Sequence, residues 1–515
     1  MTISRISVNN LTSKPMKTRL LLSIILLNFI SIVLLNAQET GAFTGNAEIG
    51  NVTIAGSASY DTDKQMFTIT GSGSGIGAVK DEFHYTYRKM TGDFILRAHI
   101  KPEVITKNPA ARTGWMIRHS LEVNSPAASA SVTGDGKASF QYRIDPSADM
   151  MEKILPVTGA DVIQLERNGN SLIMSAARMG ERFFEEKITG IELGKEVYIG
   201  LFVCSGNPGS TDKVTFKNVR IIVPPKEGFQ PYRDYLGSHV EVMDVATGDR
   251  KIVYSAPNSV QAPNWMIDEN VFVINADGAL YDFDLRTGKP VKIETGVAIN
   301  NNNDHVISFD GKKMGISSTT KEDRQSVIFT IPRKGGEAKR VTPLTPSYFH
   351  GWSPDGKYMV YAAIRNNNWG VYKISEKGGQ EVALANTPGL NDGPEYTPDG
   401  KYIYFNTNRT GNSQIWRMSP DGKNPEQLTF DELNNWFPHI SPDGKWIVFI
   451  SFPRSVPSDQ HPFYKQVYIR LMPVNGGEPK IIAYVYGGQG TMNVPNWSPD
   501  GKRIAFVSNS DFLDY

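Results

Sequence analysis

The chain has 515 residues, which is too long for one hydrophobic core and predicts two or three domains. Its 54 basic and 53 acidic residues give a net charge of +1 with no basic run, which argues against nucleic-acid binding. Glycine (47) and proline (31) are plentiful and long helical patterns are missing, so the composition predicts an all-β protein with many tight turns.

The N-terminus has the features of an export signal. Lys17 and Arg19 precede the apolar run 20–35, and Ala37 offers a small-residue cleavage site. We therefore expect a signal peptide over residues 1–37, with Met16 as an alternative start and an uncleaved anchor as the alternative outcome. Cleavage would leave a periplasmic or secreted protein with no stable membrane span.

Residues 45–223 contain a succession of short strand-like segments separated by glycine, asparagine, aspartate and proline. One of them, 140–143, alternates apolar and polar side chains, as a half-buried strand does. Eight or more such segments predict a β-sandwich of two packed sheets. The single cysteine, Cys204, provides no disulfide framework, so packing must stabilise this domain.

Four segments of this domain form a recognisable set: Gly50–Tyr60, Asp81–Tyr85, Gly114–Arg118 and Phe140–Arg143. Together they resemble the concanavalin-like (DUF1349-like) sandwich modules of secreted bacterial carbohydrate-active proteins. The resemblance implies a lectin-like fold more firmly than it implies sugar binding. Trp115, Arg118 and Tyr142 would either line a concave face or belong to the buried part of the sheet.

A proline- and glycine-containing linker is predicted over residues 224–237. After it the motif Ser-Pro-Asp-Gly-Lys, or a close variant, recurs with its aspartates at positions 268, 310, 355, 399, 443 and 500. The steps between them are 42, 45, 44, 44 and 57 residues. A repeat of about 40 to 50 residues is typical of a propeller or a solenoid array.

Each repeat contains four strand-like segments around the Pro-Asp-Gly turn, which is the content of one propeller blade. Six turns therefore predict a six-bladed β-propeller over residues 238–515. The last blade lacks two strands, and the hairpin formed by 239–245 and 250–254 is expected to supply them. Such a closure would leave no open sheet edge.

The blocks Ile415–Gly422 and Gln427–Thr429 carry the repeat most clearly. They resemble the TolB-type (PD40, WD40-like) propellers of bacterial periplasmic proteins. The resemblance implies a binding or interaction module, with a glycan or a cell-envelope protein as its partner.

Polar side chains are expected to gather in the propeller channel, because the innermost strand of every blade lines it. Alignment on the turn aspartates brings amide, carboxyl and imidazole groups to similar heights near one channel mouth, where they would either bind a sugar or only hydrate the channel. These residues are Asn303, Asp304, His305, His350, Asn391, Asp392, Glu395, Asn434, Asn435, His439, His461, Gln489 and Asn493.

No cofactor is certain, but the sequence allows a divalent metal in this channel. His305, His350 and His439 with Gln489 would supply mixed nitrogen and oxygen ligands. However, His305 and His350 lie one position earlier in their blades than Glu395 and His439, and neighbours along a strand face opposite ways.

The 57-residue step contains an insertion over residues 453–465, on the channel face where His461 is expected to approach His439. A non-catalytic binding protein is our leading expectation. The alternative is a metal-dependent uronate lyase, by resemblance to the oligogalacturonate lyases. In that case His461, Tyr464 or Lys465 would be the base and Arg454 would pair with the uronate carboxylate.

Overall fold

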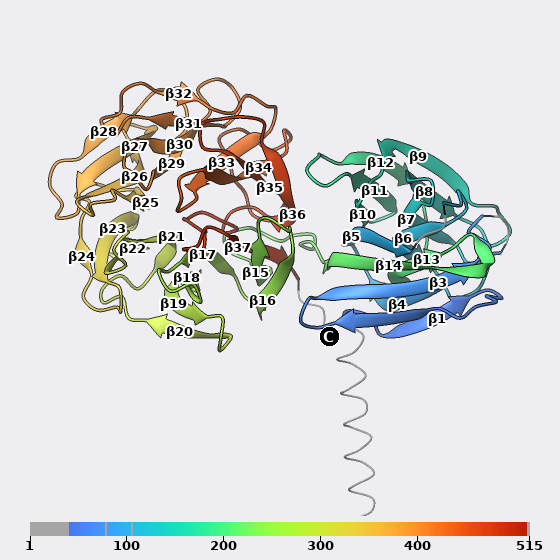
Figure 1. Cartoon of the computed structure of the whole chain (residues 1–515). Helices are drawn as coiled ribbons and strands as arrows, with labels where there is room; N and C mark the ends of the chain where they lie inside the picture. Colours follow the sequence, from blue (N-terminus) through green and yellow to red (C-terminus); the bar gives the residue numbers. More distant parts are fainter. Residues whose placement is uncertain (1–40, 78–79, 105–106, 512–515) are drawn as a thin grey trace, which may run out of the picture.

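The computed structural model describes residues 41–77, 80–104 and 107–511, and within these ranges it contains strands and loops but no helix (Figure 1). The all-β prediction is therefore confirmed. No helix among the described residues has the length and apolar character needed to cross a bilayer. The predicted signal peptide, residues 1–37, lies outside the described residues.

The first fourteen strands form two antiparallel sheets of seven strands each. The first sheet has the order β1 (Gly45–Ile49), β4 (Phe83–Thr91), β13 (Glu196–Cys204), β6 (Arg112–Arg118), β7 (Ala127–Thr133), β8 (Lys137–Arg143), β9 (Met151–Thr158). The second has the order β12 (Phe184–Thr189), β11 (Ser171–Ala177), β10 (Val162–Asn168), β5 (Phe94–Val104), β14 (Asn207–Ile222), β3 (Met66–Gly73), β2 (Ser57–Asp61). Both contribute to one hydrophobic core, for example through Leu96 and Leu201.

A buried cluster of ion pairs connects the loops of the first sheet. Asp81 accepts hydrogen bonds from Arg118 at 2.8 Å and from Arg143 at 2.9 Å, and all three side chains are fully buried. The remaining N–H groups of both arginines donate to loop carbonyls. Arg118 and Trp115 are therefore interior residues and do not line an open concave face.

We expect Asp81→Asn to lower the free energy of unfolding by about 1.5–3 kcal/mol, because a neutral amide replaces the acceptor of two buried guanidinium groups. Urea unfolding of the full chain measures the effect. Asp63→Asn, at an exposed position, is the control and should change stability by less than about 0.5 kcal/mol. Equal urea midpoints for Asp81→Asn and Asp63→Asn would contradict the stabilising role of Asp81.

Six further sheets form a ring around a channel (Figure 1). Five have four strands in chain order: β17–β20 (Val260–Trp265, Val271–Ala276, Ala279–Asp284, Lys289–Ile293), β21–β24 (Asn301–Ile307, Lys313–Thr319, Ser326–Pro332, Lys339–Arg340), β25–β28 (Ser347–Trp352, Tyr358–Arg365, Asn368–Ser375, Val382–Ala385), β29–β32 (Asn391–Tyr396, Ile403–Thr407, Gln414–Met418, Glu426–Gln427) and β33–β36 (Asn434–Ile440, Trp446–Phe452, Lys465–Pro473, Lys480–Gly487). The predicted six-bladed propeller is confirmed.

The sixth blade joins the two ends of the propeller. β15 (Gly237–Asp244) pairs with β37 (Arg503–Ser510) on one side and with β16 (Arg250–Ala256) on the other. The innermost position is held by the segment around Trp497, which forms a single bridge to Ile504. Figure 1 shows the green β15 beside the red β37. This closure was expected from the sequence.

The recurring motif is a local turn between the first two strands of a blade. In the fifth blade Ser441 donates its hydroxyl to Asp443 at 2.6 Å, and Asp443 accepts the N–H of Lys445 at 3.1 Å. Gly444 adopts a φ of 70°, which strongly favours glycine. The motif aspartates are therefore turn residues.

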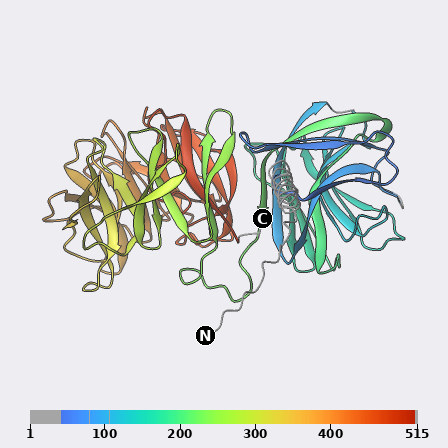
Figure 2. The same ribbon diagram turned by 90° about the horizontal axis from the view of Figure 1, so that it is seen from below.

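The two-sheet N-terminal region, 41–222, packs directly against the propeller (Figure 2). The Tyr484 hydroxyl donates to the carbonyl of Glu181 at 2.5 Å, and Gln65 exchanges two hydrogen bonds of 2.9 Å with the backbone of Ile252. Phe463 and Tyr464 of the insertion join a small apolar cluster that spans both parts.

Candidate functional site

Four predicted residues meet at the channel mouth that the inter-blade loops form, and we call them the mouth cluster: Asp304, His350, Asp392 and His461. His350 Nε2 lies 3.2 Å from Asp392 Oδ1, and His461 Nε2 lies 3.9 Å from Asp392 Oδ2. The inner strands β21, β25 and β29 bring in the first three, and the insertion before β35 brings in His461. All four belong to the set of candidate residues that the sequence analysis named.

Burial and mutual charge shift the pKa values of the mouth cluster. Burial raises the pKa of Asp304 to about 6, and the charge of Asp392 acts in the same direction. Burial acts to lower the pKa of His350, but its hydrogen bond and charge interaction with Asp392 outweigh burial and raise it. Burial lowers the pKa of His461. Burial and the charge of Asp392 thus act together on the titratable groups of the mouth cluster.

The pKa of His350 is above its unfolded value of about 6.5, so its contribution to stability is present below that pH and is lost as the pH rises through the folded value. The raised pKa of Asp304 also makes stability fall as the pH rises, between about pH 4 and about pH 6. We expect Asp392→Asn to remove the His350 contribution and to flatten the stability profile above about pH 6. Thermal unfolding across pH, with NMR titration of the His350 ring, checks this, and an unchanged profile would contradict it.

Glu395 and His439 form a separate pair deeper in the channel. His439 Nδ1 lies 2.6 Å from Glu395 Oε2, and its Nε2 lies 2.9 Å from the carbonyl of Met492. Glu395 also accepts the N–H of Ile440 at 3.0 Å. The prediction that His461 approaches His439 needs correction, because the structure pairs His461 with Asp392 and His439 with Glu395.

Several other predicted residues connect blades. His305 Nε2 lies 3.3 Å from the carbonyl of Val273 in the preceding blade, and burial lowers its pKa to about 4. Asn391 and Asn435 donate to Trp369 and Gln414 of the preceding blade, and Asn434 accepts the N–H of Ser413 from the preceding blade while it donates to Val456 in its own. Their amides are thus already bonded within the fold.

The metal site that the sequence allowed does not form. No group of three or more His, Cys, Asp or Glu side chains in the described part of the chain is arranged to hold a metal ion. His305, His350 and His439 have the separate partners given above. Gln489 is also engaged, because its Oε1 accepts a hydrogen bond from Asn493 at 2.9 Å.

The remaining insertion residues do not converge on His461. The Tyr464 hydroxyl accepts the N–H of Leu236 at 3.0 Å, and burial raises its pKa to about 12. Lys465 begins β35 with an exposed side chain, and Arg454 is exposed. Tyr464 therefore anchors the linker to the insertion.

A cavity of about 280 Å³, which we call the mouth pocket, adjoins the mouth cluster at Gln489. Its walls combine aromatic rings from the linker and the insertion with amide side chains, most of which come from strands β17, β18 and β21. The lining includes Tyr232, Tyr235, Phe463, Gln261, Asn275, Asn300, Asn301, Asn302, Asn303 and Gln489. Asn303 and Gln489 were among the predicted candidates, but the two linker tyrosines were missed, although two tyrosines in a polar linker were a usable signal.

A second cavity, of about 290 Å³, lies at the opposite mouth beside the Pro-Asp-Gly turns, and we call it the apolar pocket. Trp265, Trp352 and Trp497 line it, and Glu395 reaches its inner wall. Ile267 and Phe309 are exposed at its rim. The sequence analysis did not anticipate this pocket.

Comparisons with known proteins agree with this architecture. A family model described as the TolB β-propeller domain (PD40) matches residues 344–461. An uncharacterized protein of Agrobacterium fabrum is 42% identical over 271 residues, covering 52% of this chain and 92% of that protein. The chain belongs to the TolB-type β-propeller family.

Solved structures extend the comparison. A TolB candidate from Agrobacterium tumefaciens is 40% identical with a TM-score of 0.52, and the match covers 54% of this chain and all of that one. TolB from Acinetobacter baumannii is 15% identical with a TM-score of 0.39, covering 63% of this chain and 79% of that one. The TolB-type resemblance read from 415–422 is confirmed. The concanavalin-like resemblance of the N-terminal region stays a prediction.

Proposed function

We propose that this TolB-type protein is an exported, non-catalytic binding protein that recognises a glycan in the mouth pocket. The observation that carries the proposal is the composition of that pocket, in which exposed tyrosines face a wall of amides. The protein would act in the periplasm or after secretion, as the export signal expected over residues 1–37 implies.

The two kinds of side chain match the two faces of a sugar. Phe463 packs against Tyr232 and Tyr235 with ring centroids 5.0 and 5.9 Å apart, which orders the two tyrosines beside the pocket. An ordered ring offers an apolar surface to the C–H face of a sugar. Asparagine and glutamine side chains donate and accept hydrogen bonds, as sugar hydroxyls require.

The N-terminal region supports the same proposal as an accessory part. Its two seven-stranded sheets share one core, which is compatible with the concanavalin-like sandwich that the sequence resembles. We propose that it provides a second carbohydrate or cell-surface contact. Its direct packing on the propeller would present both parts to one partner.

A cell-envelope protein is the second candidate partner, and the apolar pocket favours it. Three tryptophans at one channel mouth with exposed Ile267 and Phe309 form a surface that suits an apolar protein side chain better than a sugar. A partner bound there would leave the mouth pocket free.

Uronate lyase chemistry gains little support from the site. Such a reaction needs a base beside a cation that polarises the uronate carboxylate. Tyr464 bonds to the linker, and the described histidines form no metal-binding group. The protein as it stands is better suited to binding.

A glycan array followed by calorimetry tests the leading proposal. We expect Tyr235→Ala to weaken binding of the selected glycan about tenfold or more, because it removes an aromatic contact of about 1.4 kcal/mol. Tyr358→Ala is the matched control, since both tyrosines are 43% exposed in the free protein and Tyr358 lies outside the mouth pocket. Absence of any glycan ligand, with capture of an envelope protein that depends on Ile267 and Phe309, would favour the second candidate.

A further inference from the structure

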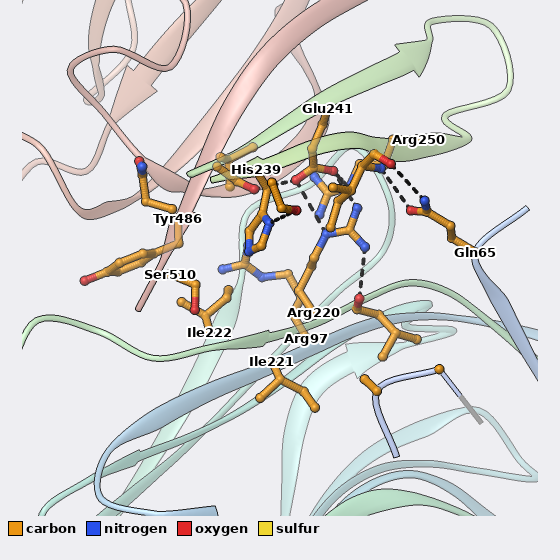
Figure 3. A pocket seen from close by; sticks show the side chains of 18 of the residues that line it. Gln65, Arg97, Arg220, Ile221, Ile222, His239, Glu241, Arg250, Tyr486 and Ser510 are labelled. Carbon is orange, nitrogen blue, oxygen red and sulfur yellow. Dashed lines mark hydrogen bonds and ion pairs between the residues drawn. The ribbon is translucent and has the colours of Figure 1, made fainter. Parts of the chain in front are cut away.

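A third cavity, of about 290 Å³, lies between the N-terminal region and the propeller, and we call it the interface cavity (Figure 3). Strands β5 and β14 supply one wall, and β15, β16, β36 and β37 supply the other. Its polar lining includes Arg97, Arg220, Arg250, Glu241 and His239. The cavity exists only when the two parts are packed together.

The charges lining the interface cavity do not balance. Three arginines face one glutamate, which leaves a surplus of two positive charges. All four side chains are nearly inaccessible, since Arg97 is 1% exposed, Arg220 8%, Arg250 4% and Glu241 0%. Buried charges are ordinarily paired with opposite charges, so the surplus calls for a counter-charge.

Glu241 forms ion pairs with two of the three arginines, Arg220 and Arg250. Its Oε2 lies 2.5 Å from Arg220 Nη2 and 3.3 Å from Arg250 Nε. Its Oε1 accepts the hydroxyl of Ser508 at 2.5 Å. Figure 3 shows these contacts gathered on one side of the cavity.

Arg97 has neutral partners instead. Its Nε and Nη2 donate to Gln164 Oε1 at 2.9 and 2.8 Å, and Nη2 also donates to Gln466. Among the described residues Arg97 forms no ion pair. Burial, together with the charge of Arg250, lowers the pKa of Arg97 to about 9, so this guanidinium still carries its charge at neutral pH.

Other titratable groups near Arg97 do not cancel the surplus. Burial lowers the pKa of His99 to about 3 and of His239 to about 4, so both rings are neutral. Glu166 attracts Arg97, but among the described residues it forms no ion pair with Arg97, and it lines a different cavity. The positive field of the interface cavity therefore persists.

We propose that the interface cavity is a binding site for a small organic anion whose carboxylate or phosphate group lies against Arg97. The planar guanidinium fork suits either anionic group. The volume is near the lower end of the range for ligand pockets, about 300 Å³, and fits a body the size of a monosaccharide. Ser510, Asn509 and Tyr486 line the same cavity and would meet its hydroxyls.

Thermal unfolding at constant ionic strength tests the site, with galacturonate and glucose 6-phosphate as anions and glucose as the neutral control. We expect Tm to rise with the logarithm of anion concentration and to be unchanged by glucose. The two anions distinguish a carboxylate ligand from a phosphate ligand. Calorimetric titration of the unaltered chain should give one anion per chain. No heat and no Tm shift up to about 10 mM of either anion would overturn the proposal.

Arg97→Met separates an anion site from a purely structural role. Without ligand, this variant should remain folded, because the loss of the hydrogen bonds to Gln164 and Gln466 is offset by the removal of an unpaired buried charge, and the anion-dependent Tm shift should vanish. Arg182→Met removes an exposed interface arginine outside the cavity, where Arg182 pairs with Glu432, and should keep the shift. A shift retained in Arg97→Met contradicts the proposal. Arg97→Met should leave glycan binding at the mouth pocket unchanged, because the two cavities share no lining residue. Failure of the anion proposal can therefore be distinguished from failure of the glycan proposal.

Discussion

Phe506→Ala is expected to lower the free energy of unfolding by about 3–5 kcal/mol. Phe506 lies in β37, fully buried in the apolar cluster that joins the last blade to its neighbour. Its strand pairs with β15 along eight residues, from Arg503 opposite Asp244 to Ser510 opposite Gly237. Loss of the ring leaves a cavity at the seam where, among the described strands, the start and the end of the propeller pair with each other.

The size of this effect depends on closure as well as on packing. β15 and β37 are separated by more than 250 residues, so their pairing restrains a long loop and hides two sheet edges. Urea unfolding monitored by tryptophan fluorescence provides the measurement. Phe430→Ala, at a position that is 77% exposed, is the control and should change stability by less than about 0.5 kcal/mol. Similar losses for the two variants would show that β37 does not close the ring.

Glu241→Gln should be comparably destabilising, by about 3–5 kcal/mol, because it leaves Arg220 and Arg250 buried without a counter-charge. Arg220 belongs to β14 of the N-terminal region and Glu241 to β15 of the propeller. The loss of stability should therefore include separation of the N-terminal region from the propeller. This separation would be visible as faster proteolysis of residues 223–236, which connect β14 to β15. Glu426→Gln breaks the ion pair between the exposed Glu426 carboxylate and Arg417 and is the control.

Acid unfolding provides an independent check on Glu241. Burial acts to raise the pKa of this carboxyl, but the charges of Arg220 and Arg250 outweigh burial and lower it to about 2. A carboxyl with a lowered folded pKa contributes stability above its unfolded pKa of about 4.5, and that contribution is lost as the pH falls toward 2. We expect Glu241→Gln to remove this part of the acid dependence. An acid midpoint identical to that of the native chain would contradict the role of Glu241.

The propeller was predictable because its signals are local. Five of the six turns combine a Ser or Thr hydroxyl, an aspartate and a glycine within a few residues, and the first keeps the aspartate, whose carboxylate accepts the N–H of Asn270, so the sequence alone marks every blade. Counting strands on either side of the turns also predicted the shared last blade, which β15, β16 and β37 confirm.

The channel was predicted only in part, and β-bulges are the reason. The pairing register shifts in all five four-stranded blades between the first and second strands, for example between Asp392 and Glu395 and between Trp436 and His439. One extra residue reverses which side chains face the channel. Alignment on the turns therefore could not show which of Asp392, His439 and His461 meet.

The sequence by itself determined the all-β class, the six blades, their closure and the TolB-type kinship, because repeated turn chemistry is encoded within each blade. Tertiary structure alone decided that Asp392 gathers His350 and His461, that the linker tyrosines form the mouth pocket, and that three arginines surround the interface cavity. Arg97, Arg220 and Arg250 lie far apart in the chain on strands of two packed parts. Their meeting depends on long-range packing, for which no local pattern of residues is a signal.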